Sequence, residues 1–160
     1  MRIREAEASD DDAIWRVLEP MIRAGETYPL PRDMSKSAGL AYWRSPRHAV
    51  FVAEEGGAIL GTYYLRANND GGGAHVANCG YVVAPDAMGR GVARALCAHS
   101  LDRARTRGFT AMQFNFVISS NDRAVKLWQS CGFKIVGTLP GAFAHPSRGF
   151  VDAYVMYQPL

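Results

Sequence analysis

The chain has few cysteines, no long apolar run and no block of charge of one sign. Its 160 residues contain only Cys79, Cys97 and Cys131, whose scattered positions exclude a disulfide framework and the spacing of a metal-binding motif. We therefore expect free, buried thiols, no metal and a reducing, cytoplasmic environment. The net charge is only +3 and the arginines are dispersed, which argues against a nucleic-acid partner.

Membrane and export signals are missing as well. No apolar stretch approaches the length of a membrane span, and residues 1–5 lack the apolar core of a signal peptide. We therefore expect no membrane partner. A chain of 160 residues without a repeat or an interdomain linker predicts a single domain, residues 1–160, with a full hydrophobic core.

Hydrophobic periodicity predicts alternating strands and helices. The expected strands are residues 3–6, 49–54, 59–65, 75–83, 111–118, 133–138 and 151–157. Apolar stripes at helical spacing predict helices after a cap at Ser9, around residues 40–43, up to about residue 107 and after Asn121. In the fifth strand, strict alternation would place four apolar side chains on one face: Met112, Phe114, Phe116 and Ile118.

A strand, two glycines spaced by one residue and a helix follow one another in residues 79–93. Gly89 and Gly91 let a ligand approach the backbone, and the first N–H groups of the helix are unpaired donors. Arg90, between the glycines, should add positive charge where an anion sits. A dinucleotide fingerprint would need a third glycine where Arg94 stands, and a P-loop would need Gly-Lys-Ser/Thr. The stretch therefore predicts a phosphate site of another kind.

Two stretches of the sequence resemble motifs of the GNAT acetyltransferases. Val83, Pro85, Gly89, Gly91 and Ala93 match the family's acyl-CoA loop in register. Residues 121–133 are similar to its later motif, which combines an asparagine, an alanine, a leucine-aromatic pair and Gly-Phe. The resemblance covers most of the chain. It implies an α/β fold with a strongly twisted mixed sheet of about seven strands, helices on both faces and a splay between strands four and five. It also implies a homodimer.

The resemblance further implies acetyl-CoA as co-substrate, with its pantetheine arm pairing like an extra strand at the splay. The positions that it assigns to this ligand are Tyr81, Val82, Val83, Met88, Gly89, Arg90, Gly91, Val92, Ala93, Arg94, Asn121 and Trp128. Met88 replaces the usual Gln or Arg, and Trp128 replaces a tyrosine that serves as an acid. Because an indole N–H is no acid near neutral pH, we interpret Trp128 as a wall of the acyl pocket.

Two asparagines are the catalytic candidates. Asn78 stands where many members of the family carry a glutamate base, and Asn115 lies on the fifth strand. Each amide offers a donor and an acceptor, which suits the amine and carboxylate of an amino acid. The alternative is that either amide only satisfies backbone groups. The candidates for the substrate site are Tyr28, Tyr42, Phe143 and His145, the last in the loop before the final strand.

The paired asparagines and Trp128 are also similar to fungal N-acetyltransferases that act on proline analogues such as azetidine-2-carboxylate. The function that this resemblance implies is transfer of an acetyl group from acetyl-CoA to the amine of a small molecule, an amino acid or an analogue, directly in a ternary complex. Two alternatives stay open. One is an acetyltransferase for protein N-termini or lysine side chains, and the other is a degenerate acyl-CoA-binding regulator without catalysis.

Overall fold

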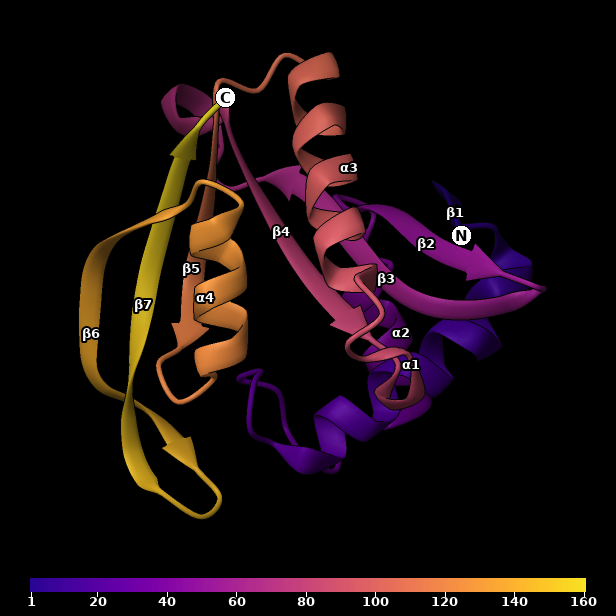
Figure 1. Ribbon diagram of the computed structural model, residues 1–160, viewed down its shortest axis with the longest axis horizontal. Helices are drawn as coiled ribbons and strands as arrows, with labels where there is room; N and C mark the ends of the chain where they lie inside the picture. Colours follow the sequence, from indigo (N-terminus) through magenta and orange to yellow (C-terminus); the bar gives the residue numbers. More distant parts are fainter.

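The computed structural model describes residues 1–160 and contains one seven-stranded sheet in the order β1-β2-β3-β4-β5-β7-β6 (Figure 1). The strands are β1 (Arg2–Glu5), β2 (Ala49–Glu55), β3 (Ala58–Ala67), β4 (Val76–Val83), β5 (Ala111–Ile118), β6 (Lys134–His145) and β7 (Gly149–Pro159). The helices are α1 (Asp11–Ala24), α2 (Lys36–Trp43), α3 (Val92–Thr106) and α4 (Asp122–Ser130), with short 3-10 turns η1 (Ala8–Asp10), η2 (Gly71–Gly73) and η3 (Pro85–Ala87). No helix is long and apolar enough to cross a membrane.

The pairing of β4 with β5 is the exception in this sheet. All other neighbouring strands are antiparallel, whereas β4 and β5 run parallel and pair only at Val76–Ala111 and Ala77–Met112. Beyond these pairs the two strands diverge (Figure 1). The mixed sheet and the predicted splay are therefore confirmed.

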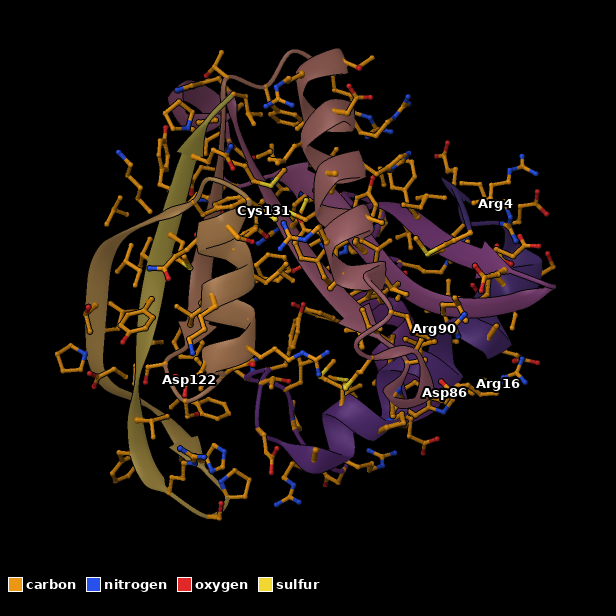
Figure 2. The ribbon with its side chains drawn as sticks, in the orientation of Figure 1. Arg4, Arg16, Asp86, Arg90, Asp122 and Cys131 are labelled. Atoms are coloured by element: carbon orange, nitrogen blue, oxygen red, sulfur yellow. The ribbon has the colours of Figure 1, made fainter.

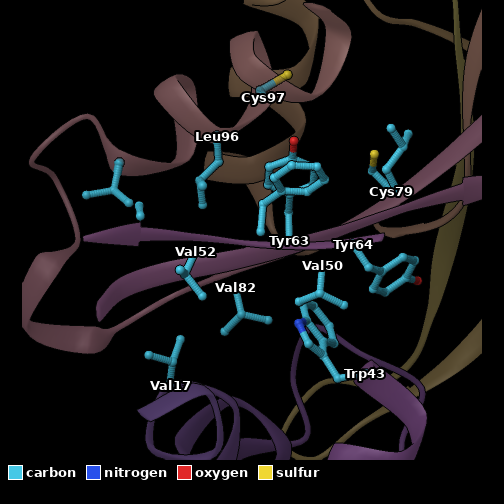
Figure 3. Close-up of a cluster of buried hydrophobic side chains, with 14 of the residues drawn as sticks. Val17, Trp43, Val50, Val52, Tyr63, Tyr64, Cys79, Val82, Leu96 and Cys97 are labelled. Carbon is cyan, nitrogen blue, oxygen red and sulfur yellow. The ribbon is translucent and has the colours of Figure 1, made fainter. Parts of the chain in front are cut away.

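Helices cover both faces of the sheet, and adjacent tyrosines of β3 point to opposite layers. The Tyr63 hydroxyl is hydrogen-bonded to His99 Nδ1 of α3 at 2.7 Å. The Tyr64 ring lies on the other face, where its centroid is 4.9 Å from that of Trp43 on α2. Figure 3 shows Tyr63 with Leu96 and Cys97 on one side of the strands and Trp43 on the other. Adjacent residues of a strand point to opposite faces, so the two tyrosines belong to different layers.

The alternation predicted for β5 is wrong beyond Phe114. A β-bulge lies between Phe114 and Val117, where β5 advances by one residue more than β7. Val117 therefore packs into the main core with Phe114, while Phe116 and Ile118 join a second small cluster. A bulge reverses the direction of every later side chain, and its position depends on the partner strand.

The N-terminal cap also differs from the prediction. Ser9 lies inside η1 and caps nothing, since α1 follows Asp10 without a side-chain cap. The Asp10 carboxylate instead accepts the Glu7 N–H at 2.7 Å and two bonds from the Arg4 guanidinium, at 2.7 and 2.9 Å. Arg4 Nε also donates to Glu54 of β2. Asp10 therefore joins β1, the first turn and β2.

We expect Asp10→Asn to lower the free energy of unfolding by about 1–3 kcal/mol at pH 7 because charge-assisted hydrogen bonds are lost. The Arg4 guanidinium holds the pKa of Asp10 below its usual range. The contribution is therefore complete above about pH 4, the unfolded value, and is lost as the pH falls through the lower folded pKa. Urea unfolding at pH 7 and at about pH 2.5 measures it. The exposed Asp33→Asn is the control, and an equal loss at both pH values would contradict the prediction.

Candidate active site

The backbone of β4 offers unpaired groups to the splay. The Ala84 N–H bonds to the Leu60 carbonyl, and the Asn68 N–H bonds to the Val76 carbonyl, so the even-numbered residues of β4 pair with β3. In an antiparallel ladder the residues between them turn their N–H and C=O groups to the opposite edge. That edge faces β5, so Tyr81 and Val83 present backbone donors and acceptors where the strands have diverged.

The loop after β4 ends in a set of free N–H groups. Gly89 and Gly91 have φ of +80° and +81°, a region that disfavours side chains. The first backbone bond of α3 joins the Ala95 N–H to the Gly91 carbonyl at 3.0 Å, so the N–H groups of residues 91–94 precede all helical pairing. A Cβ at Gly91 would meet nothing within 4 Å. The loop thus exposes donors to open space beside it.

A cavity of about 480 Å³ joins this loop to the splay and to α4. Its lining includes ten of the twelve residues assigned to the ligand: Tyr81, Val83, Met88, Gly89, Gly91, Val92, Ala93, Arg94, Asn121 and Trp128. The loop and the start of α4 lie at the same end of the sheet, as Asp86, Arg90 and Asp122 mark in Figure 2. Six lining residues were missed: Ala87, Arg123, Ala124, Lys126, Leu127 and Ser130. Of those on α4, Ala124 lies one turn before Trp128 on the same face, so helical spacing could have found it.

Three cations line this cavity without a carboxylate partner: Arg94, Arg123 and Lys126. None of them belongs to any of the eight ion pairs of the structure. Arg94 donates to Ser130 Oγ at 2.9 Å, and Arg123 Nη2 lies 3.5 Å from the point that a Cβ at Gly89 would occupy. The cavity lining contains no acidic side chain, so the cavity favours a polyanion.

Two of the twelve assigned residues do not line the cavity. The Arg90 side chain forms an ion pair with Glu55 at the β2–β3 turn, so the positive charge expected at the anion lies elsewhere, on Arg94, Arg123 and Lys126. The buried side chain of Val82 points to the face of the sheet that α1 covers, and its backbone groups bond to β3. These backbone groups are not available to a ligand, because the even-numbered residues of β4 pair with β3.

Aromatic side chains close the inner end of the cavity. Trp128 is buried, and its ring centroid lies 4.9 Å from that of Tyr81 and 5.3 Å from that of Phe114. The Tyr81 hydroxyl is hydrogen-bonded to Ser100 Oγ at 2.6 Å, and burial raises the pKa of Tyr81 well above its usual value. Neither Trp128 nor Tyr81 is thus suited to give up a proton near neutral pH.

Asn78 lies at the apex of the splay, one residue beyond the last β4–β5 pair. Its amide Nδ2 donates to the Gln113 carbonyl of β5 at 2.9 Å, and its Oδ1 accepts from Arg66 Nε at 3.2 Å. The side chain is buried. Both ends of the amide are therefore engaged within the protein, in the arrangement expected of a residue that fixes how far β4 and β5 separate.

Asn115, the second catalytic candidate, is exposed on β5. Its Nδ2 donates to Asn68 Oδ1 at 2.6 Å, and its Oδ1 accepts from Gln113 Nε2 at 2.9 Å. The two asparagines are thus connected through Gln113, whose carbonyl bonds to Asn78 and whose amide bonds to Asn115. Neither asparagine lines the 480 Å³ cavity.

Tyr28 reaches the splay from the segment between α1 and α2. Its hydroxyl donates to the Tyr81 carbonyl at 3.2 Å, one of the groups that face β5. A Cβ at Gly80 would lie 2.7 Å from this oxygen and 2.6 Å from the Tyr64 ring, so only glycine permits the contact. Burial raises the pKa of Tyr28, which keeps the hydroxyl protonated as a donor.

The other substrate candidates are separated. Tyr42 is partly exposed on α2, 6.3 Å from the Tyr64 centroid, and Phe143 is buried in the small cluster with Ile118. His145 is the last residue of β6, which extends well past the expected end at residue 138, so it lies at a hairpin tip instead of in a long loop. Of these candidates, His145 lines a second cavity.

This second cavity, of about 200 Å³, is built from polar side chains of three separate segments. They are the α1–α2 segment, the β5–α4 turn and the tip of the β6–β7 hairpin, which approach one another at the open end of the sheet (Figure 1). Its lining residues are Glu26, Thr27, Ser120, Asn121, His145, Ser147 and Arg148. Asn121 lines both cavities and accepts the Ala124 N–H as the cap of α4.

Solved structures with this architecture define the class of protein. A GCN5-related N-acetyltransferase from Kribbella flavida is 42% identical and superposes with a TM-score of 0.94, covering 99% of this chain and 97% of that one. The structure of yncA from Salmonella typhimurium, solved with its cofactor acetyl-CoA, is 24% identical with a TM-score of 0.88 and covers 100% and 94% of the two chains. The molecule therefore has the GNAT fold.

Sequence comparison extends this from fold to family. The sequence profile of the acetyltransferase (GNAT) family matches residues 14–133. N-acetyltransferase aca1 of Schizosaccharomyces pombe is 26% identical over 151 residues, which cover 84% of this chain and 72% of that protein. The chain belongs to the GNAT family of N-acetyltransferases, which confirms the family resemblance and the expectation of an enzyme.

Proposed function

We propose that this enzyme transfers the acetyl group of acetyl-CoA to the amine of a small molecule, an amino acid or an analogue, with both substrates bound at once. The observation that carries the proposal is the junction of two cavities at Asn121, one large and lined by cations, the other small and polar. A nucleotide thioester suits the first cavity, and a compact acceptor suits the second.

The residues present fit the phosphates and the arm of acetyl-CoA. The free N–H groups of residues 91–94 and the cations Arg94, Arg123 and Lys126 would hold its phosphates. The backbone groups of Tyr81 and Val83 would pair with the amides of its arm. When bound, the ligand supplies an acetyl group activated as a thioester.

The other residues of the site have two roles: some exclude water, and others fix the positions of the strands. Trp128 and Tyr81, packed against Phe114 behind them, form an apolar wall that would keep water from the thioester. Asn78 would hold β4 and β5 at the separation that the arm requires, so we assign it a positioning role. Asn115 lines neither cavity and is connected to Asn78 through Gln113, so we assign it a positioning role as well.

A small acceptor is favoured over a peptide by the size of the second cavity. Its volume of about 200 Å³ is less than half of the 480 Å³ of the first cavity. Its lining comes from three parts of the chain and forms a compact polar hollow instead of a long groove. The similarity in the strand asparagines and Trp128 to enzymes that act on proline analogues supports a compact amino acid.

Release of free CoA from acetyl-CoA, measured against a panel of amines, tests the proposal. The panel contains compact amino acids, proline analogues, methionine-like amino acids, polyamines and short peptides. We expect at least one compact amino acid to give a kcat/KM about tenfold or more above every peptide. Faster turnover of peptides would contradict it in favour of a protein acetyltransferase. Tight acetyl-CoA binding without turnover of any amine would indicate a regulator.

A further inference from the structure

The 200 Å³ cavity combines two opposite charges that have no partner in the protein. Glu26 lines it from the α1–α2 segment and Arg148 lines it from the β6–β7 turn. Neither residue belongs to any of the eight ion pairs. Glu26 is also the only carboxylate that lines either cavity. The cavity therefore offers one place for a cation and one for an anion.

The neutral groups of this cavity add donors beside Arg148. His145 Nδ1 accepts the backbone N–H of Ser147 at 3.2 Å, so in the neutral ring the proton belongs to Nε2, which is left as a donor. Asn121 Oδ1 accepts the Ala124 N–H, and the Asn121 NH₂ group has no partner. With the guanidinium, these donors match a carboxylate, which can only accept.

We infer that the acceptor is a zwitterionic amino acid whose free carboxylate is bound by Arg148, with His145 and Asn121, and whose ammonium group is bound by Glu26. The inference rests on the proposed function and narrows it. Glu26 and Arg148 are both exposed, so water solvates either one without a partner, and the preference rests on attraction: only a zwitterion engages both side chains. A free carboxylate thus becomes a requirement, which would exclude simple amines, polyamines and peptides, because the residue of a peptide that carries the amine has no free α-carboxylate.

A matched set of three acceptors tests this requirement. The set consists of the amino acid that the panel turns over fastest, its α-carboxamide and the amine that lacks the carboxyl carbon; for proline these are proline, prolinamide and pyrrolidine. We expect the carboxamide and the amine to have a kcat/KM about tenfold or more below that of the acid. Arg148→Gln should raise the KM of the acid by a similar factor and change that of the carboxamide less than about twofold.

The variants provide the controls. Arg105→Gln removes an exposed arginine on α3, away from both cavities, and should leave all three KM values unchanged. Arg148→Lys keeps the charge and should recover part of the loss. Equal turnover of acid and carboxamide, or an equal effect of Arg148→Gln on both, would overturn this inference alone. Turnover of peptides but of no small amine would overturn the proposed function and this inference together.

Discussion

Gly91→Ala should weaken the binding of acetyl-CoA by about thirtyfold or more. At φ of +81° a residue with a Cβ costs about 1–2 kcal/mol, so the variant loop favours a different conformation. The added methyl group would also stand in the open space beside the free N–H groups, where phosphate must approach. Together these effects correspond to about 2–3 kcal/mol of binding free energy. Isothermal titration with acetyl-CoA measures it.

The chain contains a matched control for this prediction. Gly108, which follows the C-terminal end of α3, has φ of +83°, and a Cβ there would likewise meet nothing within 4 Å. Gly108→Ala therefore carries a similar backbone strain at the end of α3 that points away from the loop, outside the cavity lining. We expect it to bind acetyl-CoA normally. Equal weakening in both variants would mean that strain, and not contact with the ligand, accounts for the loss.

Trp43→Ala should lower the free energy of unfolding by about 3–5 kcal/mol, the largest loss of stability that we expect from one side chain. Trp43 is fully buried between α2 and the sheet. Its Nε1–H donates to Thr62 Oγ1 at 3.0 Å, and the Thr62 hydroxyl donates to the Phe51 carbonyl at 2.8 Å. The variant would leave both a large cavity and an unpaired acceptor. Guanidinium unfolding followed by circular dichroism measures the change.

The neighbouring Tyr42→Ala serves as the comparison, because Tyr42 lies on the same helix but is 37% exposed. We expect a loss of about 1 kcal/mol or less there. For Trp43→Phe, the loss in the free energy of unfolding should lie between those of Trp43→Ala and Tyr42→Ala, because phenylalanine fills much of the space and lacks only the N–H donor. If the free energy of unfolding of Trp43→Ala lay within about 1 kcal/mol of that of the unchanged protein, the prediction would be wrong, and the core would have closed around the vacated space. Trp43 also packs against Tyr28, so reduced activity in these variants should accompany the loss of stability.

Short-range sequence patterns determined the helices and strands of this protein and the glycine loop after β4. The period of apolar residues separated strands from helices because burial of one face imposes that period. Gly89 and Gly91 marked the turn because few other residues tolerate a positive φ. The resemblance of two motifs to those of the GNAT family implied the fold, and with it the splay that the short β4–β5 pairing confirms.

Contacts between distant segments decided the rest. The sequence placed a positive charge on the loop at Arg90, yet Glu55 binds that side chain because the β2–β3 turn lies beside it. The sequence left two roles open for Asn78, a catalytic amide or one that satisfies backbone groups, and the packing of β5 engages its Nδ2 with the Gln113 carbonyl. The bulge in β5 redirected Phe116 for the same reason, because β7 sets the register.

The second cavity shows most clearly what only contacts between distant segments can decide. Its lining residues come from the segment after α1, the turn after β5 and the tip of the β6–β7 hairpin, far apart in the sequence. Of these residues, the sequence had singled out only Asn121 and His145, because no local pattern marks an isolated glutamate or arginine in a turn. Local chemistry determined the strands, the helices and the glycine loop after β4, since these depend on neighbouring residues. Only the tertiary structure brought Glu26 and Arg148 to one cavity, because the folding of three distant segments against one sheet sets their proximity.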